Sequence, residues 1–211
     1  ADPRSRAVKL GDVASTQLGK MLDSASQTGS GARPYLRAAN IPDWGVVDTA
    51  DLRTMDFSGD ELEKFSVQPG DLLVTEGGAA GRCAVYRGET SRCFQNAIHR
   101  VRADTKMTSN EFLALVLEHL SLTRQLDRYC STTTIKHLSS SSLKSVEVQL
   151  PALVDQSGLV QSVAACTAKV AALHAQSERA NQLRDQLLHD LLSGAHTVPE
   201  SYDRFLAEVA S

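Results

Sequence analysis

Cys93 and His99 are the residues of this chain whose types could supply a nucleophile and a general base. A lone cysteine and histidine close together in one strand more often have a structural role. The sequence contains no GxxxxGK[ST] phosphate-binding loop, no GxGxxG dinucleotide loop and no GxSxG nucleophile turn. We therefore expect no catalytic site and no cofactor. An enzyme that uses Cys93 and His99 stays open as an alternative, which thiol alkylation would test.

Arginine is concentrated between Gly81 and Arg102, where five arginines stand against the single acid Glu89. Residues 1–150 as a whole are balanced, with 18 Lys+Arg and 18 Asp+Glu, and the stretch from Asp43 to Glu63 is acidic. A guanidinium carries a fork of donors that matches the guanine edge or a phosphate. The same residues would also suit a solvated charged surface. Charge alone leaves both interpretations open.

A long helix is predicted from Pro151 to Gly194, because no glycine or proline interrupts the run after Gly158. Apolar or small residues recur alternately four and three positions apart, which is the heptad spacing of a helix that packs against another helix. They are Leu159, Val163, Cys166, Val170, Leu173, Ser177 and Ala180, followed by Leu183, Leu187 and Leu191. At about 1.5 Å per residue the rod is on the order of 57 Å long, too long to be hidden inside a domain of roughly 150 residues. We expect it to be a spacer and a docking surface.

The residues before the long helix predict an α+β domain. The strongest β signal is a turn at Pro69–Asp71, then a strand at Leu72–Thr75, a break at Gly77–Gly81 and a return strand at Arg82–Tyr86. Other expected elements are strands at Tyr35–Ile41, Phe94–Val101 and Val146–Leu150, helices at Asp60–Phe65 and Asn110–Tyr129 with Ser109 as N-cap, and a turn at Leu138–Leu143. Ala7–Val13 is either a short strand or an extended entry into a turn at Gly11–Asp12. Because strands and helices alternate irregularly, without βαβ spacing, an α+β fold is favoured over a doubly wound sheet.

Composition sets the remaining bounds. The 211 residues are 42% hydrophobic and 22% charged, with no apolar run long enough to span a membrane, and we expect no secretory leader. The four cysteines form no CxxC pair and have no histidine at zinc spacing, so we expect reduced thiols and no metal. We expect a cytoplasmic protein with a globular domain at 1–150, the long helix at 151–194 and a short amphipathic segment at 195–211.

Eight segments occur in an order that carries a family resemblance. They are Lys9–Val13 (KLGDV), Gly19–Leu22 (GKML), Pro34–Ile41 (PYLRAANI), Gly70–Tyr86 (GDLLVTEGGAAGRCAVY), Phe94–Arg102 (FQNAIHRVR), Thr133–Ser139 (TTIKHLS), Val148–Gln156 (VQLPALVDQ) and Leu191–Gly194 (LLSG). Together they resemble the specificity (S) subunit of type I restriction–modification systems. The chain departs from that pattern at Ala79–Ala80, Ser131, Ala152 and Asp155. It also has one recognition domain and one long helix where a full subunit has two of each, so it resembles a half-size form.

The resemblance implies a DNA-binding subunit that is not an enzyme. In this family a target-recognition domain reads one half of a bipartite double-stranded DNA sequence, and the helix docks methyltransferase (M) subunits. A restriction (R) subunit stays open as a further partner. The expected contacts are arginine forks at Arg82, Arg92 and Arg100, adenine-reading amides at Gln95 and Asn96, and phosphate contacts at Thr132, Thr133, Thr134 and Lys136. For the two amides, capping of a strand end is the alternative.

The heptad seam predicts a homodimer through the long helix, because an apolar stripe of this length needs a partner. The expected dimer contacts are Leu159, Val163, Val170, Leu173, Leu183 and Leu187. An antiparallel pair would place two recognition domains at opposite ends of a rod and would read a symmetric bipartite target, whereas a parallel coiled coil would place both at one end. The alternative in a different class is a coiled-coil scaffold with a protein-binding head and no DNA recognition. The salt dependence of duplex binding separates the two classes.

Overall fold

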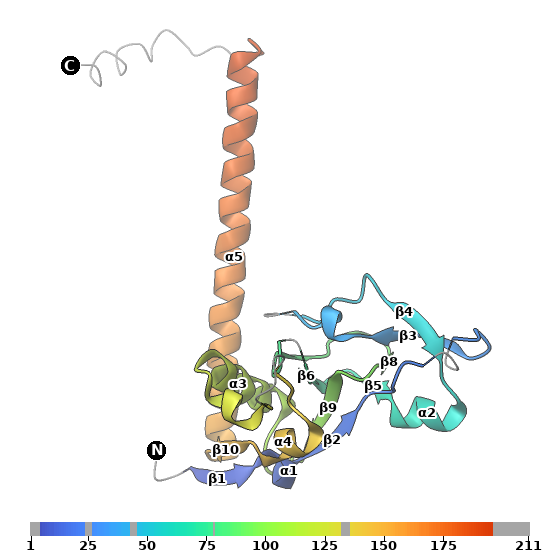
Figure 1. Cartoon of the computed structure of the whole chain (residues 1–211). Helices are drawn as coiled ribbons and strands as arrows, with labels where there is room; N and C mark the ends of the chain where they lie inside the picture. Colours follow the sequence, from blue (N-terminus) through green and yellow to red (C-terminus); the bar gives the residue numbers. More distant parts are fainter. Residues whose placement is uncertain (1–4, 24–26, 43–45, 78, 132–135, 196–211) are drawn as a thin grey trace. The chain divides into compact units, whose positions relative to one another are not determined.

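The computed structural model describes residues 5–23, 27–42, 46–77, 79–131 and 136–195. The chain divides into two compact units, Ala1–Val160 and Gln161–Ser211, and we call the first unit the head. The described part of the head combines three β-sheets with short helices, which is the α+β arrangement that the sequence predicts (Figure 1). Within the described ranges, no helix is both long and apolar enough to cross a membrane.

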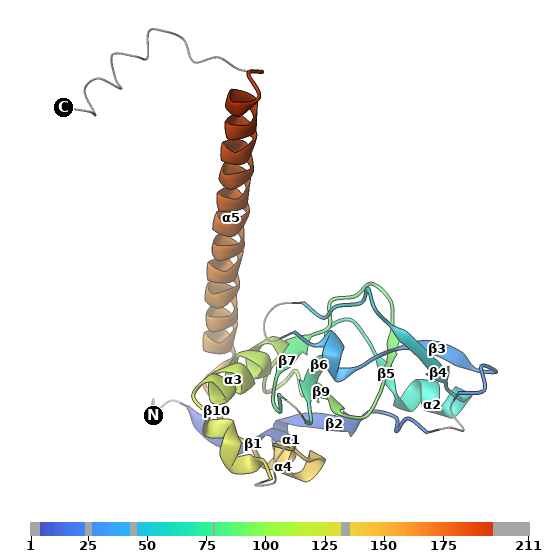
Figure 2. The same cartoon turned by 45° about the horizontal axis from the view of Figure 1, so that its top comes forward.

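The central sheet of the head has the strand order β2-β9-β6-β7, with every neighbouring pair antiparallel. Its strands are β2 (Ala14–Leu18), β9 (Ile98–Ala103), β6 (Leu72–Thr75) and β7 (Cys83–Val85). Strand β6 is buried at every position, which explains why its sequence LLVT lacks a polar alternation. Helix α3 (Asn110–Leu122) packs beside β6 and β7 (Figure 2), and the Ser109 hydroxyl caps it by accepting the Phe112 N–H at 3.1 Å.

A second sheet, of order β4-β3-β8-β5, lies on the side of the head away from α3 in both views (Figures 1 and 2). Its strands are β4 (Arg53–Asp56), β3 (Ala32–Leu36), β8 (Arg92–Phe94) and β5 (Ser66–Val67), and β3 runs parallel to β8. Helix α2 (Gly59–Lys64) begins with a capping box between Ser58 and Glu61. The short 3₁₀ turn η2 (Ala38–Asn40) follows β3.

The chain closes on itself through a two-stranded ladder of β1 (Arg6–Lys9) and β10 (Glu147–Leu150). Helix α1 (Leu10–Val13) packs against α4 (Ser140–Ser145), and η3 (Gln125–Tyr129) follows α3. These elements share a core with α3, in which Leu10, Leu113 and Leu143 have no exposed surface. The two ends of the head's sequence are therefore held together by the same apolar cluster.

The predicted long helix is present as α5, Leu153–Leu192. Gly194 follows its end with a φ of 75°, the left-handed conformation that suits glycine after a helix. The predicted dimer contacts are between 42 and 61% exposed in the single chain. They are Leu159, Val163, Val170, Leu173, Leu183 and Leu187.

Five elements differ from the sequence prediction. The segment Ala7–Val13 is a strand only to Lys9, where helix α1 follows, and the segment Tyr35–Ile41 is a strand only to Leu36, before η2. The helix predicted over Asn110–Tyr129 breaks at Arg124, whose φ is 57°, so that Leu126 in η3 packs into the core. The strand predicted over Phe94–Val101 is two strands, β8 and β9, in different sheets. The expected turn at Leu138–Leu143 contains the start of α4, which the Ser139 hydroxyl caps. At the helix break a distant apolar partner decides where the element ends, and at α4 a side-chain cap decides where it begins.

Candidate nucleic-acid interface

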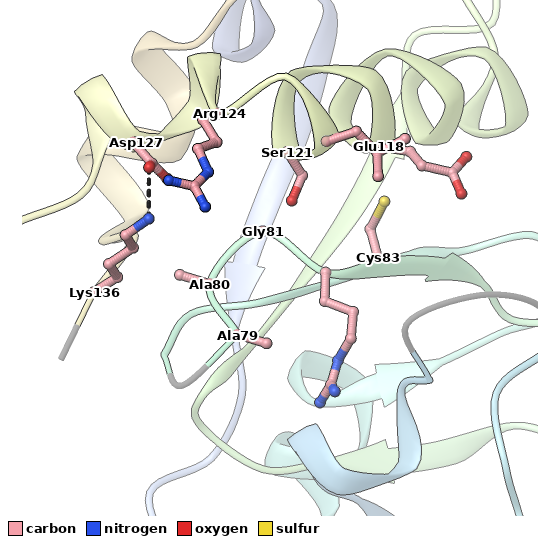
Figure 3. A pocket seen from close by; sticks show the side chains of 11 residues that line it. Ala79, Ala80, Gly81, Cys83, Glu118, Ser121, Arg124, Asp127 and Lys136 are labelled. Atoms are coloured by element: carbon pink, nitrogen blue, oxygen red, sulfur yellow. Dashed lines mark hydrogen bonds and ion pairs between the residues drawn. The ribbon is translucent and has the colours of Figure 1, made fainter.

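A hollow of about 480 Å³ opens between the turn that joins β6 to β7 and the segment in which α3 passes into η3 (Figure 3). Its walls are Ala79, Ala80, Gly81, Arg82, Cys83, Glu118, Ser121, Leu122, Arg124, Asp127 and Lys136. Two hydrogen bonds hold the turn between β6 and β7. The Thr75 hydroxyl donates to the Ala79 carbonyl at 2.5 Å, and the Gly81 N–H donates to the Thr75 carbonyl at 2.9 Å. Gly81 has a φ of 85°, and a Cβ there would lie 2.0 Å from Leu126 Cδ2. Only glycine fits this position.

Three cationic side chains line this hollow. Lys136 Nζ forms an ion pair with Asp127 Oδ2 at 2.5 Å (Figure 3), and Arg82 Nη2 donates to the Ala38 carbonyl at 2.9 Å. Arg124 is exposed, and within the described part of the chain its guanidinium has no hydrogen bond or ion pair. The cations outnumber the two acids, Glu118 and Asp127, so the hollow is suited to an anionic group such as a phosphate.

The predicted adenine readers Gln95 and Asn96 occupy the turn between β8 and β9. Their backbone N–H groups donate to the carbonyls of Leu36 and Lys20 at 3.0 and 2.8 Å. A Cβ at Gly19 would lie 2.1 Å from the Gln95 carbonyl oxygen, so glycine is required for this close approach. The backbone, rather than the side chains, closes the turn. Within the described ranges, neither side-chain amide has a hydrogen-bond partner, which leaves both available to a ligand.

Two of the arginines predicted to read guanine, Arg92 and Arg100, donate hydrogen bonds to other residues of the chain. Arg92 Nη1 donates to the Ser91 carbonyl at 3.2 Å and to the Thr90 hydroxyl. Arg100 Nη1 donates to the carbonyls of Lys64, at 3.2 Å, and Ser66, and burial lowers the pKa of its guanidinium. Arg100 thus links β9 to the strand β5 of the second sheet.

Of the remaining predicted DNA contacts, the structure describes only Lys136. Lys136 lines the hollow, while Thr132, Thr133 and Thr134 lie outside the described residues. Sequence reasoning missed Arg124 and Glu118 because both belong to a stretch that reads as one regular amphipathic helix. In the structure, Glu118 in α3 and Arg124 at the break after α3 line the same hollow as Lys136.

The alternative pair of Cys93 and His99 is separated by the fold, because Cys93 lies in β8 and His99 in β9 of another sheet. His99 is fully buried, its Nε2 donates to the Leu138 carbonyl at 2.9 Å, and its Nδ1 faces the Ser140 hydroxyl at 3.4 Å. Both ring nitrogens therefore have other partners. Burial raises the pKa of the Cys93 thiol to about 11. The described residues form no cluster of three His, Cys, Asp or Glu side chains that could hold a metal ion.

The segments that carry the predicted DNA contacts meet at one end of the central sheet. Thr75, the last residue of β6, pairs with Ile98, the first residue of β9, so the turns that follow β6 and precede β9 leave the sheet at the same end. The Glu76 N–H donates to the Ala97 carbonyl at 2.8 Å, and Gly77 pairs with His137, the neighbour of Lys136. Residues far apart in the sequence are thereby brought to one edge of the head.

Comparisons with known proteins agree with this architecture. Residues 5–179 match the family described as Type I restriction modification DNA specificity domain. No curated protein matches the sequence.

Three solved structures have the same fold. A chain from a study of complex assembly and conformational transition of the type I R-M system is 21% identical, with a TM-score of 0.67 over 88% of this chain and 44% of that one. The HsdS subunit from Thermoanaerobacter tengcongensis is 20% identical, with a TM-score of 0.61 over 82% and 40%. The type I S subunit from M. genitalium is 16% identical, with a TM-score of 0.60 over 96% and 48%. The chain spans less than half the length of each of these structures. Because the family match covers most of the sequence, this chain belongs to the family of type I restriction–modification DNA specificity domains.

Proposed function

We propose that this chain is the sequence-reading component of a type I restriction–modification complex and is not itself an enzyme. Methylation and cleavage would belong to M and R subunits that it recruits. The observation that carries this proposal is the convergence of Arg82, Gln95, Asn96 and Lys136 at one end of the central sheet. These residues come from three segments of the sequence, and nothing but the fold brings them together.

The residues at this end of the central sheet suit two kinds of DNA contact, with phosphates and with bases. The cations of the hollow, Arg82, Arg124 and Lys136, suit phosphate contacts, and Thr132–Thr134 precede Lys136 in the sequence. The uncommitted amides of Gln95 and Asn96 suit adenine, which offers a donor and an acceptor side by side in the major groove. Arg92 is half-buried and would reach a base only by leaving the Ser91 carbonyl. Arg100 enters the proposal as the residue that holds β9 in place behind these turns.

A quantitative binding experiment tests the proposal. The full chain, alone and with its methyltransferase partner, is titrated with fluorescent duplexes across a range of salt concentrations. We expect weak binding by the chain alone, because residues 1–150 carry no net charge, and tighter binding with the partner. In both cases log K should fall linearly with log salt, since phosphate contacts release counterions. Binding that is absent, or that does not respond to salt, contradicts DNA recognition and favours the scaffold alternative.

The long helix supports a second part of the proposal, which is a homodimer. Its seam is more than two-fifths exposed at every predicted contact, and exposed apolar surface of this extent marks an interaction site. A second copy in the antiparallel sense would cover the seam and place two heads at opposite ends of a shared rod. Such a dimer would read two identical half-sites in inverted orientation, separated by a spacer that the rod determines. The helix would also dock the M subunits.

A further inference from the structure

Glu118 is one of the two acidic side chains that line the hollow. It projects from α3 at the end marked by Cys83, whereas the Asp127–Lys136 ion pair closes the opposite end (Figure 3). Within the described ranges, its carboxylate has no hydrogen bond or ion pair. Burial raises the pKa of the Glu118 carboxyl group. A partly buried carboxylate without a donor is destabilising, and a ligand that brings a donor would relieve that cost.

The distribution of charge restricts what this ligand can be. Arg124 and Lys136 attract an anionic group to their end of the hollow, while Glu118 repels anions from its own end. The occupant must therefore combine a negative group with a hydrogen-bond donor. In DNA, cytosine and adenine offer an exocyclic amino group in the major groove, whereas guanine and thymine present acceptors there.

We infer that Glu118 is a specificity-determining residue, whose carboxylate accepts a hydrogen bond from the exocyclic amino group of a cytosine or an adenine. Arg124 and Lys136 hold a neighbouring phosphate in the same hollow. This inference rests on the proposed function, because it requires that the hollow faces duplex DNA. It adds a base-reading residue on α3 to the amides of the turn between β8 and β9.

Selection from a pool of random duplexes tests the role of Glu118. The full chain with its methyltransferase partner is compared with Glu118→Ala and Glu118→Gln, and Glu111→Gln is the matched control. Glu111 lies on the same helix but pairs with Arg87, at 3.3 Å, outside the hollow. We expect wild type and the control to require cytosine or adenine at one position. In Glu118→Ala that preference should fall roughly 5- to 150-fold, with the other positions unchanged. Glu118→Gln keeps an acceptor oxygen and adds an amide donor, so it should favour adenine over cytosine at this position.

Base analogues then identify the amino group. At the selected position cytosine is replaced by 2-pyrimidinone, or adenine by purine, and each analogue lacks only the exocyclic amino group. The replacement should weaken binding by wild type and leave binding by Glu118→Ala unchanged, and the analogue that has this effect distinguishes cytosine from adenine.

The outcomes separate this inference from the proposed function. Identical base preferences in wild type and Glu118→Ala overturn the inference while DNA recognition stands. Failure of the wild-type complex to select any sequence overturns both. Thermal melting of each variant verifies folding, and we expect Glu118→Ala to be at least as stable as wild type, because the substitution removes an unpartnered carboxylate.

Discussion

The side-chain carbonyl of Gln156, in the first turns of α5, accepts a hydrogen bond from the Thr108 hydroxyl at 2.9 Å. Its amide group donates to the carbonyls of Met107 and Pro151 at 3.0 and 2.9 Å. Gln156 is 2% exposed and Thr108 1% exposed, so this network is shielded from water. The start of the long helix is thereby bonded to the loop that precedes α3, inside the head.

Gln156→Ala should lower the free energy of unfolding by about 1–3 kcal/mol, because it leaves a buried hydroxyl and two carbonyls without partners. Urea unfolding of the full chain measures the change. Gln161→Ala is the matched control, since Gln161 lies on the same helix and is exposed. Equal unfolding midpoints for the two variants would show that the network does not stabilise the head.

Stability should fall as the pH drops from about 7.5 to 5, because His99 is buried in its neutral form. Burial lowers the pKa of His99, while its bond to the Leu138 carbonyl and the Glu76 carboxylate, 3.9 Å away, oppose the shift. The unfolded chain then binds a proton at a pH where the folded chain does not. The stabilisation is complete above the unfolded pKa of about 6.5, and is lost as the pH falls towards the folded pKa, by at most about 1.4 kcal/mol per pH unit.

Urea unfolding at both pH values measures this effect. His99→Gln keeps a donor for the Leu138 carbonyl and cannot titrate, so the fall in stability with pH should become smaller. His119→Gln, at an exposed position on α3, is the control and should behave as wild type. A His99→Gln variant with the wild-type pH dependence would show that other groups are responsible.

Arg100→Ala should weaken folding as well as DNA binding. Its guanidinium donates to two backbone carbonyls and lies 5.6 Å from the centre of the Phe94 ring, so its loss leaves acceptors of the second sheet without a donor. We expect a loss of roughly 1–3 kcal/mol in the free energy of unfolding. Arg87→Ala removes an exposed arginine of the same basic segment and should cost little. Unchanged melting of Arg100→Ala would show that the residue does not hold the two sheets together.

Arg124→Ala should weaken duplex binding at every sequence and reduce the slope of log K against log salt by about one, which is the signature of a single lost phosphate contact. Folding should be unaffected, since the guanidinium has no partner within the described ranges. Arg87→Ala again serves as control, because Arg87 lies outside the hollow. If both variants show the same salt slope as wild type, the hollow does not contact phosphate.

A charge on the seam of α5 should dissociate the dimer. Val163→Lys combined with Val170→Lys places ammonium groups where apolar contact is expected, so sedimentation at micromolar concentration should change from dimer to monomer. Gln161→Lys adds the same kind of charge off the seam and should leave the dimer intact. A wild-type chain that sediments as a monomer would contradict the homodimer.

The direction of the helix pair is measured by spin labels on Met21→Cys in a Cys166→Ser background. Met21 is exposed, and replacing Cys166 removes the exposed native thiol. Antiparallel helices of 40 residues should separate the labels of the two copies by several tens of ångströms, on the order of the roughly 60 Å length of α5. Short label distances would favour the parallel coiled coil.

The sequence by itself determined the features that depend on neighbouring residues. The long helix, the cap at Ser109 and strand β6 follow from local signals, namely an uninterrupted heptad pattern, a hydroxyl before an amphipathic run and a Pro-Gly-Asp turn before an apolar run. The ordered set of segments also carried the family resemblance, because each segment can be compared without knowing its place in space. The concentration of arginine was visible in the same way.

Only the tertiary structure decided what each of those arginines does. Arg82 lines a hollow while Arg100 binds the carbonyls of another sheet, although both come from one basic segment. Arg124 lines the hollow that Glu118 also lines, at the point where the helix breaks and Leu126 packs into the core beside Gly81. These assignments depend on partners far away in the sequence. Periodicity and composition describe only neighbours along the chain, so the sequence patterns could not predict which partner each arginine has in the fold.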